Sequence, residues 1–325
     1  MNGVFAVGLR EHYSAHDATP EMGFPQYDYQ DEKGAMAAIQ GPVLPRKRIA
    51  AELKRLREQS GLTLEQVAEE LLISTSKLSR LENAQGSPQA RDVRDLINFY
   101  KIDGTDLAAK LTRWVRASHR QGWWHDYSDA ITGDLDTHIA YESEAATARV
   151  YAIPVLPALL QTADYARAYY AQNEPWRTAG DLDALVELRQ RRQAALDERT
   201  DQAPLRLIAV TYESGLHQLI GGPEVMRAQL DHLVERSTAP NVDLRILPFD
   251  GPMPFTSTCM YAYFEFSDSL DRDVVAVETH AGFRYIETTS RVAAYRRHYE
   301  HLVESALPPD ESRALIRSIQ DRLPR

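Results

Sequence analysis

A short run of hydroxyl and cationic side chains lies between residues 75 and 80, where leucines recur at helical spacing. Leu78 and Leu81 would face inward on such a helix, so the remaining side chains point outward. The outward set is Thr75, Ser76, Lys77, Ser79 and Arg80. An arginine can donate two hydrogen bonds to a guanine edge, small hydroxyls can reach bases or phosphates, and a lysine can neutralise a phosphate. This chemistry suits the major groove of DNA, although a solvated helical face in a small bundle would show the same pattern.

Two N-terminal caps place this face on the second of two short helices. Thr63 and Gln66 have the spacing of a capping box, and Ser74 can cap a second helix eleven residues later. The three apolar residues 71–73 leave no room for a long loop, so the helices must meet at a steep angle. Two short helices joined in this way predict a helix-turn-helix, whose second helix can enter the major groove.

Three further helices complete an all-α bundle of about five helices. The first opens at Pro45 and ends at Gly61, a fourth follows the turn at 86–88, and a fifth spans about 105–120. One stripe of the fifth helix carries Arg113, Arg116 and Arg120. This helix could connect two domains or pack against a second copy of the chain.

Three cations crowd the start of the first helix, where the helix dipole favours acids. They are Arg46, Lys47 and Arg48. Cations placed against the dipole suggest another attraction, and we expect them to contact DNA phosphates.

From residue 46 to residue 100 the chain resembles the Cro/repressor-like (XRE) helix-turn-helix family, on the pattern LKRLREQSGLTLEQVAEELLISTSKLSRLEN. The resemblance implies a structural ion pair between Arg57 and Glu82, which would hold the first helix against the recognition helix. The family's base-reading positions fall on Thr75, Ser76 and Arg80. Leu64 departs from the pattern, because family members often carry a phosphate-contacting Gln there.

The charge of the chain is divided unevenly along its length. The net charge is −10 over 325 residues, with −4 in residues 1–45, +5 in residues 46–121 and −11 in residues 122–325. Attraction to phosphates is therefore confined to the helix-turn-helix segment, and the remainder repels DNA. This division favours an acidic regulatory domain joined to a basic DNA reader.

Several classes of protein are disfavoured by the composition. A single cysteine, Cys259, excludes an internal disulfide and a cysteine-based zinc cluster. No apolar run reaches the length of a membrane span, and the nearest, residues 150–160, is broken by Pro154 and Pro157. Residues 4–9 are too short for a signal peptide. We expect a cytoplasmic protein with no cofactor and no metal.

Three segments follow from these patterns. Residues 1–44 are rich in Gly, Pro and acids and are expected to be a disordered N-terminal extension. Alternatively, Phe24, Tyr27 and Tyr29 could form a binding arm, or translation could start at Met36. Residues 45–121 would form the helix-turn-helix domain, and residues 122–325 a mixed α+β regulatory or partner-binding domain.

The second domain mixes strand and helix patterns. Strands are predicted at 205–212, 242–247, 260–266, 274–277 and 284–287. Helices are predicted at 164–171, 181–197, 223–235, 292–307 and 311–323. Hairpin-spaced strands followed by terminal helices indicate α+β architecture rather than a doubly wound sheet.

The second domain also resembles the C-terminal domain of a group of actinobacterial XRE regulators. The matching segments include GWW, YESEA, LPALLQTADYARAYY, RQRRQAALD, GGPEVMRAQLDHL, NVDLRILPF and VETHAGFRYIE. Such proteins are regarded as antitoxin-like or developmental regulators and are often encoded beside a small partner protein. Ala158 stands where the family usually has Gly, which puts in doubt any role there that needs a positive φ.

Apolar and aromatic residues of this domain could form a surface for a partner or ligand. They are Trp123, Trp124, Leu159, Leu160, Tyr165 and Tyr169. A domain edge, a core or a dimer face explains the same residues equally simply.

Reactive side chains are few. An acid-base cluster could combine Glu213, His217, Glu278 and His280, but no nucleophile accompanies them. His125 and Asp126 lack a second ligand pair for a metal, and Gly221 and Gly222 before Pro223 read as a turn rather than a phosphate cradle. We therefore expect no catalytic residues and no enzyme.

Two functions remain. The first is a homodimeric, sequence-specific transcriptional regulator that binds double-stranded DNA, with a second domain that senses a ligand or a partner protein. The alternative is an antitoxin-like interaction protein that sequesters a small protein from a neighbouring gene and binds DNA only for autoregulation.

Overall fold

The computed structural model describes residues 42–131, 134–200, 202–251, 259–268, 271–279 and 282–324. The predictions for the N-terminal extension, including its aromatic residues and the alternative start at Met36, concern residues outside this description. The expected extension reached residue 44, whereas the first helix already begins at Val43.

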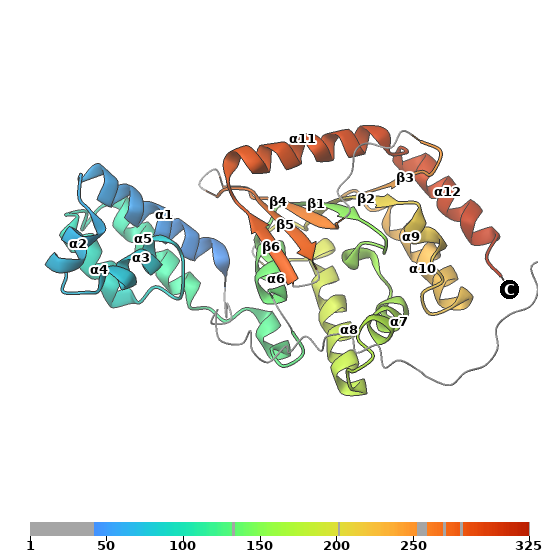
Figure 1. Cartoon of the computed structure of the whole chain (residues 1–325), viewed down its shortest axis with the longest axis horizontal. Coiled ribbons are helices and arrows are strands. Elements are labelled where there is room, and N and C mark those ends of the chain that lie inside the picture. Colours follow the sequence, from blue (N-terminus) through green and yellow to red (C-terminus); the bar gives the residue numbers. More distant parts are fainter. Residues whose placement is uncertain are drawn as a thin grey trace, which may run out of the picture. The chain divides into compact units, whose positions relative to one another are not determined.

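The N-terminal part is an all-α bundle (Figure 1). Its helices are α1 (Val43–Gln59), α2 (Leu64–Glu70), α3 (Thr75–Glu82), α4 (Ala90–Phe99) and α5 (Asp106–Ser118). Residues spaced three and four apart on each helix meet in one core. That core contains Ile49, Leu53, Val67, Ala68, Leu78, Val93, Leu96, Ile97, Ala108, Leu111 and Val115. The helix-turn-helix expected from the sequence is α2 and α3.

Four helices of this bundle end in the same way. The residue after each helix C-cap has a left-handed backbone, at Gly61, Leu72, Ala84 and Lys101. After α2, the amide of Ile73 donates to the carbonyl of Ala68 at 2.9 Å and the amide of Leu72 donates to Glu69 at 3.1 Å. These are the two bonds of a Schellman motif, which satisfies the last carbonyls of the helix.

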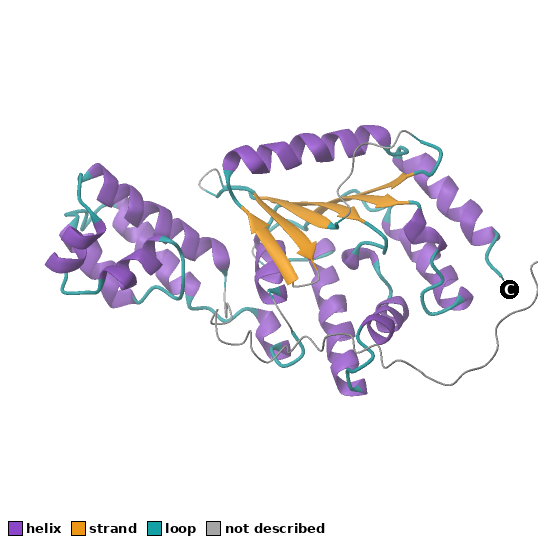
Figure 2. Ribbon diagram, viewed as in Figure 1, coloured by secondary structure: helices purple, strands orange, loops and turns teal. Residues whose placement is uncertain are grey.

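The C-terminal part is built around a mixed six-stranded sheet (Figure 2). Its strands are β1 (Thr147–Ala152), β2 (Arg206–Tyr212), β3 (Val242–Leu247), β4 (Tyr261–Glu265), β5 (Val274–Thr279) and β6 (Gly282–Ile286). The order in the sheet is β3-β2-β1-β4-β5-β6. The strands β1, β2 and β3 pair in parallel, whereas β4 pairs antiparallel with β1, and β5 and β6 continue antiparallel.

Helices cover both faces of this sheet. They are α6 (Leu135–Glu144), α7 (Ala163–Asn173), α8 (Ala179–Gln193), α9 (Ser214–His217), α10 (Pro223–Arg236), α11 (Thr289–Ser305) and α12 (Pro309–Asp321). Successive strand residues alternate between two cores, as the pleat requires. Ala148 and Leu207 face the core formed with α6, α7, α8, α10 and α12, and Tyr151 and Ile208 face the core covered by α11 (Figure 1).

A helical region followed by a domain of helices and a mixed sheet confirms the expected fold class. The central strand β1 and the helices α6 and α9 were not predicted. The parallel half of the sheet was consequently not foreseen either. Among the described residues, no helix has the length and apolar content needed to cross a membrane.

Candidate nucleic-acid interface

The helices α2 and α3 each begin at a side-chain cap that the sequence predicted. The Thr63 hydroxyl accepts from the amide of Gln66 at 3.3 Å, and the Gln66 side chain accepts from the amide of Thr63 at 2.8 Å. The Ser74 hydroxyl accepts from the amide of Lys77 at 3.2 Å. These caps fix where α3 begins and therefore which of its side chains point outward.

The residues predicted to contact DNA differ in their exposure and in the partners that their side chains have within the protein. Ser76 and Arg80 are exposed, and the guanidinium of Arg80 makes no hydrogen bond or ion pair within the described part of the chain. Thr75, Lys77 and Ser79 are half-buried. The Lys77 ammonium lies 2.7 Å from a carboxylate oxygen of Asp92 on α4, so its charge is balanced inside the bundle. Arg80 is thus the side chain of this set best placed to reach an external partner.

The inner side of α3 is held by a buried ion pair with α1. Arg57 donates from Nε and Nη2 to the Glu82 carboxylate at 2.9 to 3.0 Å, and Nη1 donates to the carbonyl of Leu62 at 3.1 Å. The hydrogen bond to Glu82 raises the pKa of the Arg57 guanidinium. This is the pair that the family resemblance implied. It fixes the orientation of α3 rather than contributing a surface for DNA.

The three cations at the start of α1 all have partners within the protein, and those of Lys47 and Arg48 lie in the C-terminal part. Arg46 is buried, and its Nε donates to the carbonyl of Pro42 at 3.3 Å. The Lys47 ammonium lies 2.5 Å from a carboxylate oxygen of Glu287. Burial lowers the pKa of Lys47, and Glu287 partly offsets that effect. The geometry does not favour the expected phosphate contacts of Arg46 and Lys47, because Arg46 is buried and the ammonium of Lys47 is paired with Glu287.

Arg48 is held in the same way. Its Nε donates to Asp271 at 2.7 Å, its Nη2 bonds the second oxygen of the same carboxylate, and Asp268 lies 3.5 Å away. The hydrogen bond to Asp271 raises the pKa of Arg48. Arg48 therefore joins α1 to the segment after β4 instead of facing DNA as expected.

A carboxylate that sequence reasoning missed caps α1. Glu144, at the end of α6, accepts hydrogen bonds from the amides of Val43 at 2.7 Å and Leu44 at 3.3 Å. Burial raises the pKa of Glu144 to about 7 although these amides favour its ionised form. The acid that the helix dipole favours is thus supplied from residue 144, about a hundred positions away, where no local pattern could reveal it.

The expected partner surface of the second domain is mostly core. Trp124, Leu159, Leu160 and Tyr165 are each no more than 4% exposed, so none of the four can meet a partner. Trp123 and Tyr169 are partly buried against the same core. The two tryptophans pack edge to face with ring centroids 5.9 Å apart, which is the anchoring role weighed as their alternative.

The proposed acid-base cluster is not assembled. His217 and Glu213 lie 3.1 Å apart, one helical turn from each other. Glu278 lies at the end of β5, whereas Glu213 directly follows β2. These two strands are three positions apart in the sheet, and neighbouring strands are about 4.8 Å apart, so β5 lies about 14 Å from β2. His280 lies outside the described residues. Gly222 caps α10 with a φ of 88° and Pro223 opens that helix, as expected of a turn.

A buried charge network lies beneath the sheet. Arg192 on α8 donates from Nε and Nη2 to Glu142 on α6, both at 2.8 Å, and neither side chain is more than 6% exposed. Burial favours the neutral acid, yet the guanidinium holds the pKa of Glu142 below its ordinary value. Burial lowers the pKa of neighbouring His138 to about 3, so its ring is neutral. This network ties α6 to α8 and has no access to DNA.

Comparison with known protein families matches both parts of the chain. Residues 135–318 match a family described as Domain of unknown function (DUF5753), which is more than half of the chain. The chain belongs to the DUF5753 family. In this family member the matched segment begins at the first residue of α6 and ends within α12. Residues 48–109 match a helix-turn-helix domain, from within α1 to the first turn of α5. The second match supports a DNA-binding regulator. No curated protein and no solved structure matches the chain.

Proposed function

We propose that this chain is a sequence-specific transcriptional regulator of the XRE type that binds double-stranded DNA through α3. One observation carries the proposal, which is the contrast between the two sides of α3. The inner side is fixed by buried Leu78 and by the Arg57–Glu82 pair, and the outer side presents exposed Ser76 and unpaired Arg80. A rigid helix with a free guanidinium outward is what base reading in a major groove requires.

The distribution of charge supports the same function. The segment containing the bundle carries +5, whereas residues 122–325 carry −11. Phosphates attract the first part and are repelled by the second. The acidic part is proposed to receive a ligand or a small partner protein that alters DNA binding.

The proposal includes a homodimer. One recognition helix covers only a half-site, and symmetric regulators place two such helices about one turn of DNA apart. Light scattering of the free protein and of its DNA complex checks this, and a monomeric mass in both would contradict it.

The second candidate is an antitoxin-like protein of the actinobacterial type, which sequesters a small protein encoded nearby. The strong negative charge of residues 122–325 favours it if that partner is basic. DNA binding would then serve autoregulation only.

Fluorescence anisotropy with the DNA upstream of the chain's own gene tests the first proposal. We expect binding that falls steeply with salt and exceeds binding to a scrambled duplex by at least about a thousandfold. Equal affinity for both duplexes would contradict sequence-specific regulation. Repeating the titration with the neighbouring gene product separates the candidates. A ligand-responsive regulator should bind the DNA upstream of several genes, whereas an autoregulating antitoxin should bind only the DNA upstream of its own gene.

A further inference from the structure

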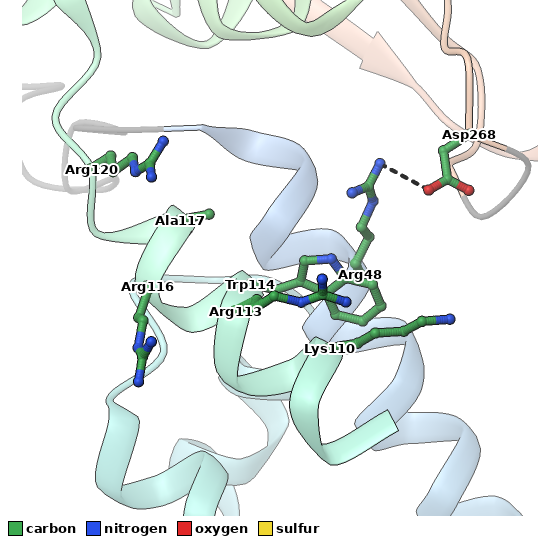
Figure 3. Close-up of a pocket in the computed structure, with 8 residues that line it drawn as sticks. All are labelled: Arg48, Lys110, Arg113, Trp114, Arg116, Ala117, Arg120 and Asp268. Atoms are coloured by element: carbon green, nitrogen blue, oxygen red, sulfur yellow. Dashed lines mark ion pairs between the residues drawn. The ribbon is translucent and has the colours of Figure 1, made fainter. Parts of the chain in front are cut away.

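A cavity of about 600 Å³ lies beside α5, away from the recognition helix (Figure 3). Its lining residues are Arg48, Lys110, Arg113, Trp114, Arg116, Ala117, Arg120 and Asp268. Small-molecule sites typically have volumes of about 300 to 1,000 Å³. Arg48 precedes Arg57 by nine residues on α1, which places it about 13 Å along the helix axis from the brace to α3.

The charge of this lining is strongly one-sided. Five of its side chains are cations and one is a carboxylate. Lys110, Arg113, Arg116 and Arg120 are exposed, and in the described part of the chain none of them has a hydrogen-bond or ion-pair partner. Lys110, Arg113 and Arg116 are three residues apart on α5, and Arg120 follows two residues after its end, so like charges adjoin one another. An anion between them would relieve their repulsion.

Arg48 already holds an anion at the edge of the cavity. It bonds to buried Asp271 and, at 3.5 Å, to the more exposed Asp268, which extends into the lining (Figure 3). A second anion could approach Arg48 only by displacing Asp268 or by sharing the guanidinium with it. The Asp268 carboxylate therefore opposes binding by the remaining cations.

Trp114 adds a flat apolar surface to this charged wall. It is half-buried, and the Arg48 guanidinium lies 5.8 Å from its ring centroid. An arginine over an aromatic ring is a stable arrangement that leaves the guanidinium edge free to donate.

We propose that this cavity binds a small molecule with two or more phosphate groups, held by the cations of α5 and competing with Asp268 for Arg48. Arginine fits phosphate through paired hydrogen bonds, and several phosphates match several cations better than a single carboxylate does. The chain's binding of such a compound requires no DNA, so this inference stands or falls separately from the proposed function.

Isothermal titration calorimetry of the full chain tests it, with inorganic tripolyphosphate and ATP as probes. We expect saturable binding that weakens with salt. Arg113→Gln combined with Arg120→Gln should lower the affinity at least about tenfold, and Asp268→Asn should raise it roughly two- to fivefold. Lys54→Gln removes an exposed cation from another face of α1 and should leave the affinity unchanged. Circular dichroism checks that each variant is folded.

Comparison of the two probes identifies the source of the phosphates. ATP binding more tightly than tripolyphosphate, with the difference lost in Trp114→Leu, would support the proposal and indicate a nucleotide. Equal binding of both would support it and indicate an inorganic polyphosphate.

Binding of neither probe would overturn the proposal, and an equal loss of affinity for every duplex in the arginine variant would then identify the cluster as a DNA-backbone contact. An Asp268→Asn variant that binds no tighter than wild type would also overturn it. So would a Lys54→Gln variant that loses as much affinity as the arginine variant.

Discussion

Arg80 and Arg192 carry the same charge in opposite settings. Arg80 lies exposed on α3 with no partner in the described residues, and Arg192 lies buried beneath the sheet with both guanidinium arms on Glu142. Removing a partner from the buried pair leaves a charge in an apolar surrounding, whereas removing the exposed guanidinium changes almost nothing inside the protein. A cation is thus available to an external partner where it is exposed and unpaired, as at Arg80, whereas Arg192, like Arg57 of the bundle, holds two helices together.

The buried pair gives the largest expected effect. Glu142→Ala should lower the free energy of unfolding by about 3 to 5 kcal/mol, because Arg192 would remain buried and unpaired. Urea denaturation followed by circular dichroism measures the change. Replacing both residues, as Glu142→Leu with Arg192→Met, should recover most of the loss. A double variant as unstable as the single one would show that packing, not charge, dominates there.

Glu144 gives a pH-dependent effect of nearly that size. The pKa of Glu144 is about 7 in the folded chain and about 4.5 in the unfolded chain, so folding favours the protonated carboxyl. The stability that this carboxyl contributes is complete below about pH 4.5 and is lost as the pH rises through about 7. His138, with a lowered pKa, acts oppositely, since stability falls as pH drops below about 6.5. The wild-type curve therefore combines two opposing slopes. Among the charged groups around Glu144, Asp271 raises its pKa and Arg48 lowers it, both less than burial does.

Glu144→Gln isolates the first slope. Relative to wild type, the variant should be more stable at pH 8 than at pH 5, by up to about 3 kcal/mol, because glutamine imitates the neutral acid. Denaturation at both pH values provides the measurement. A stability difference independent of pH would mean that Glu144 does not titrate in this range.

Arg80→Ala should act on DNA and leave the fold intact. We expect a loss of about 1 to 3 kcal/mol on the specific site, a relaxed preference at one base pair, and an unfolding free energy within about 0.5 kcal/mol of wild type. The affinity for random DNA should fall by a smaller factor. Anisotropy titrations on both duplexes decide. If Arg80→Ala lowered the affinity for the specific and the random duplex by the same factor, Arg80 would be a phosphate contact rather than a base-reading residue.

The smallest expected effect concerns the turn of the helix-turn-helix. Leu72 has a φ of 52° and a side chain that is 92% exposed, so it contributes strain and little packing. Leu72→Gly should raise the free energy of unfolding by about 1 kcal/mol. Ala51→Gly, on the exposed face of α1, is the matched control and should lower it by about 0.5 to 1 kcal/mol. Thermal denaturation of the two variants should give shifts of opposite sign.

Local signals predicted local structure well. The capping box at Thr63 and the cap at Ser74 fixed the two central helices, because a cap acts within three residues. Only one of the four left-handed helix ends was foreseen, that at Gly61. The other three ends have the same left-handed backbone conformation although none of them is a glycine, the residue that usually indicates it; they are Leu72, Ala84 and Lys101.

Long-range structure was missed where its causes were remote in sequence. Residues 147–152 include two alanines and an arginine, which have little strand preference, yet they form the central strand because β2 and β4 pair on either side. Arg48 was assigned to phosphate because its partner Asp271 stands 223 residues away. The ion pair of Arg57 was foreseen only through family resemblance.

The helix α1 joins both parts of the protein. Near its start, hydrogen bonds and ion pairs join it to Glu144, Glu287 and Asp271. Near its end, Arg57 forms an ion pair with Glu82 of α3. Its 17 residues make a rod about 25 Å long. Used as a lever, a rod of that length turned by about 10° at its base moves its tip by about 4 Å, more than the rise of one base pair, about 3.4 Å. If α3 reads DNA as proposed, a rotation of that size at the carboxylates would displace it by about one base pair.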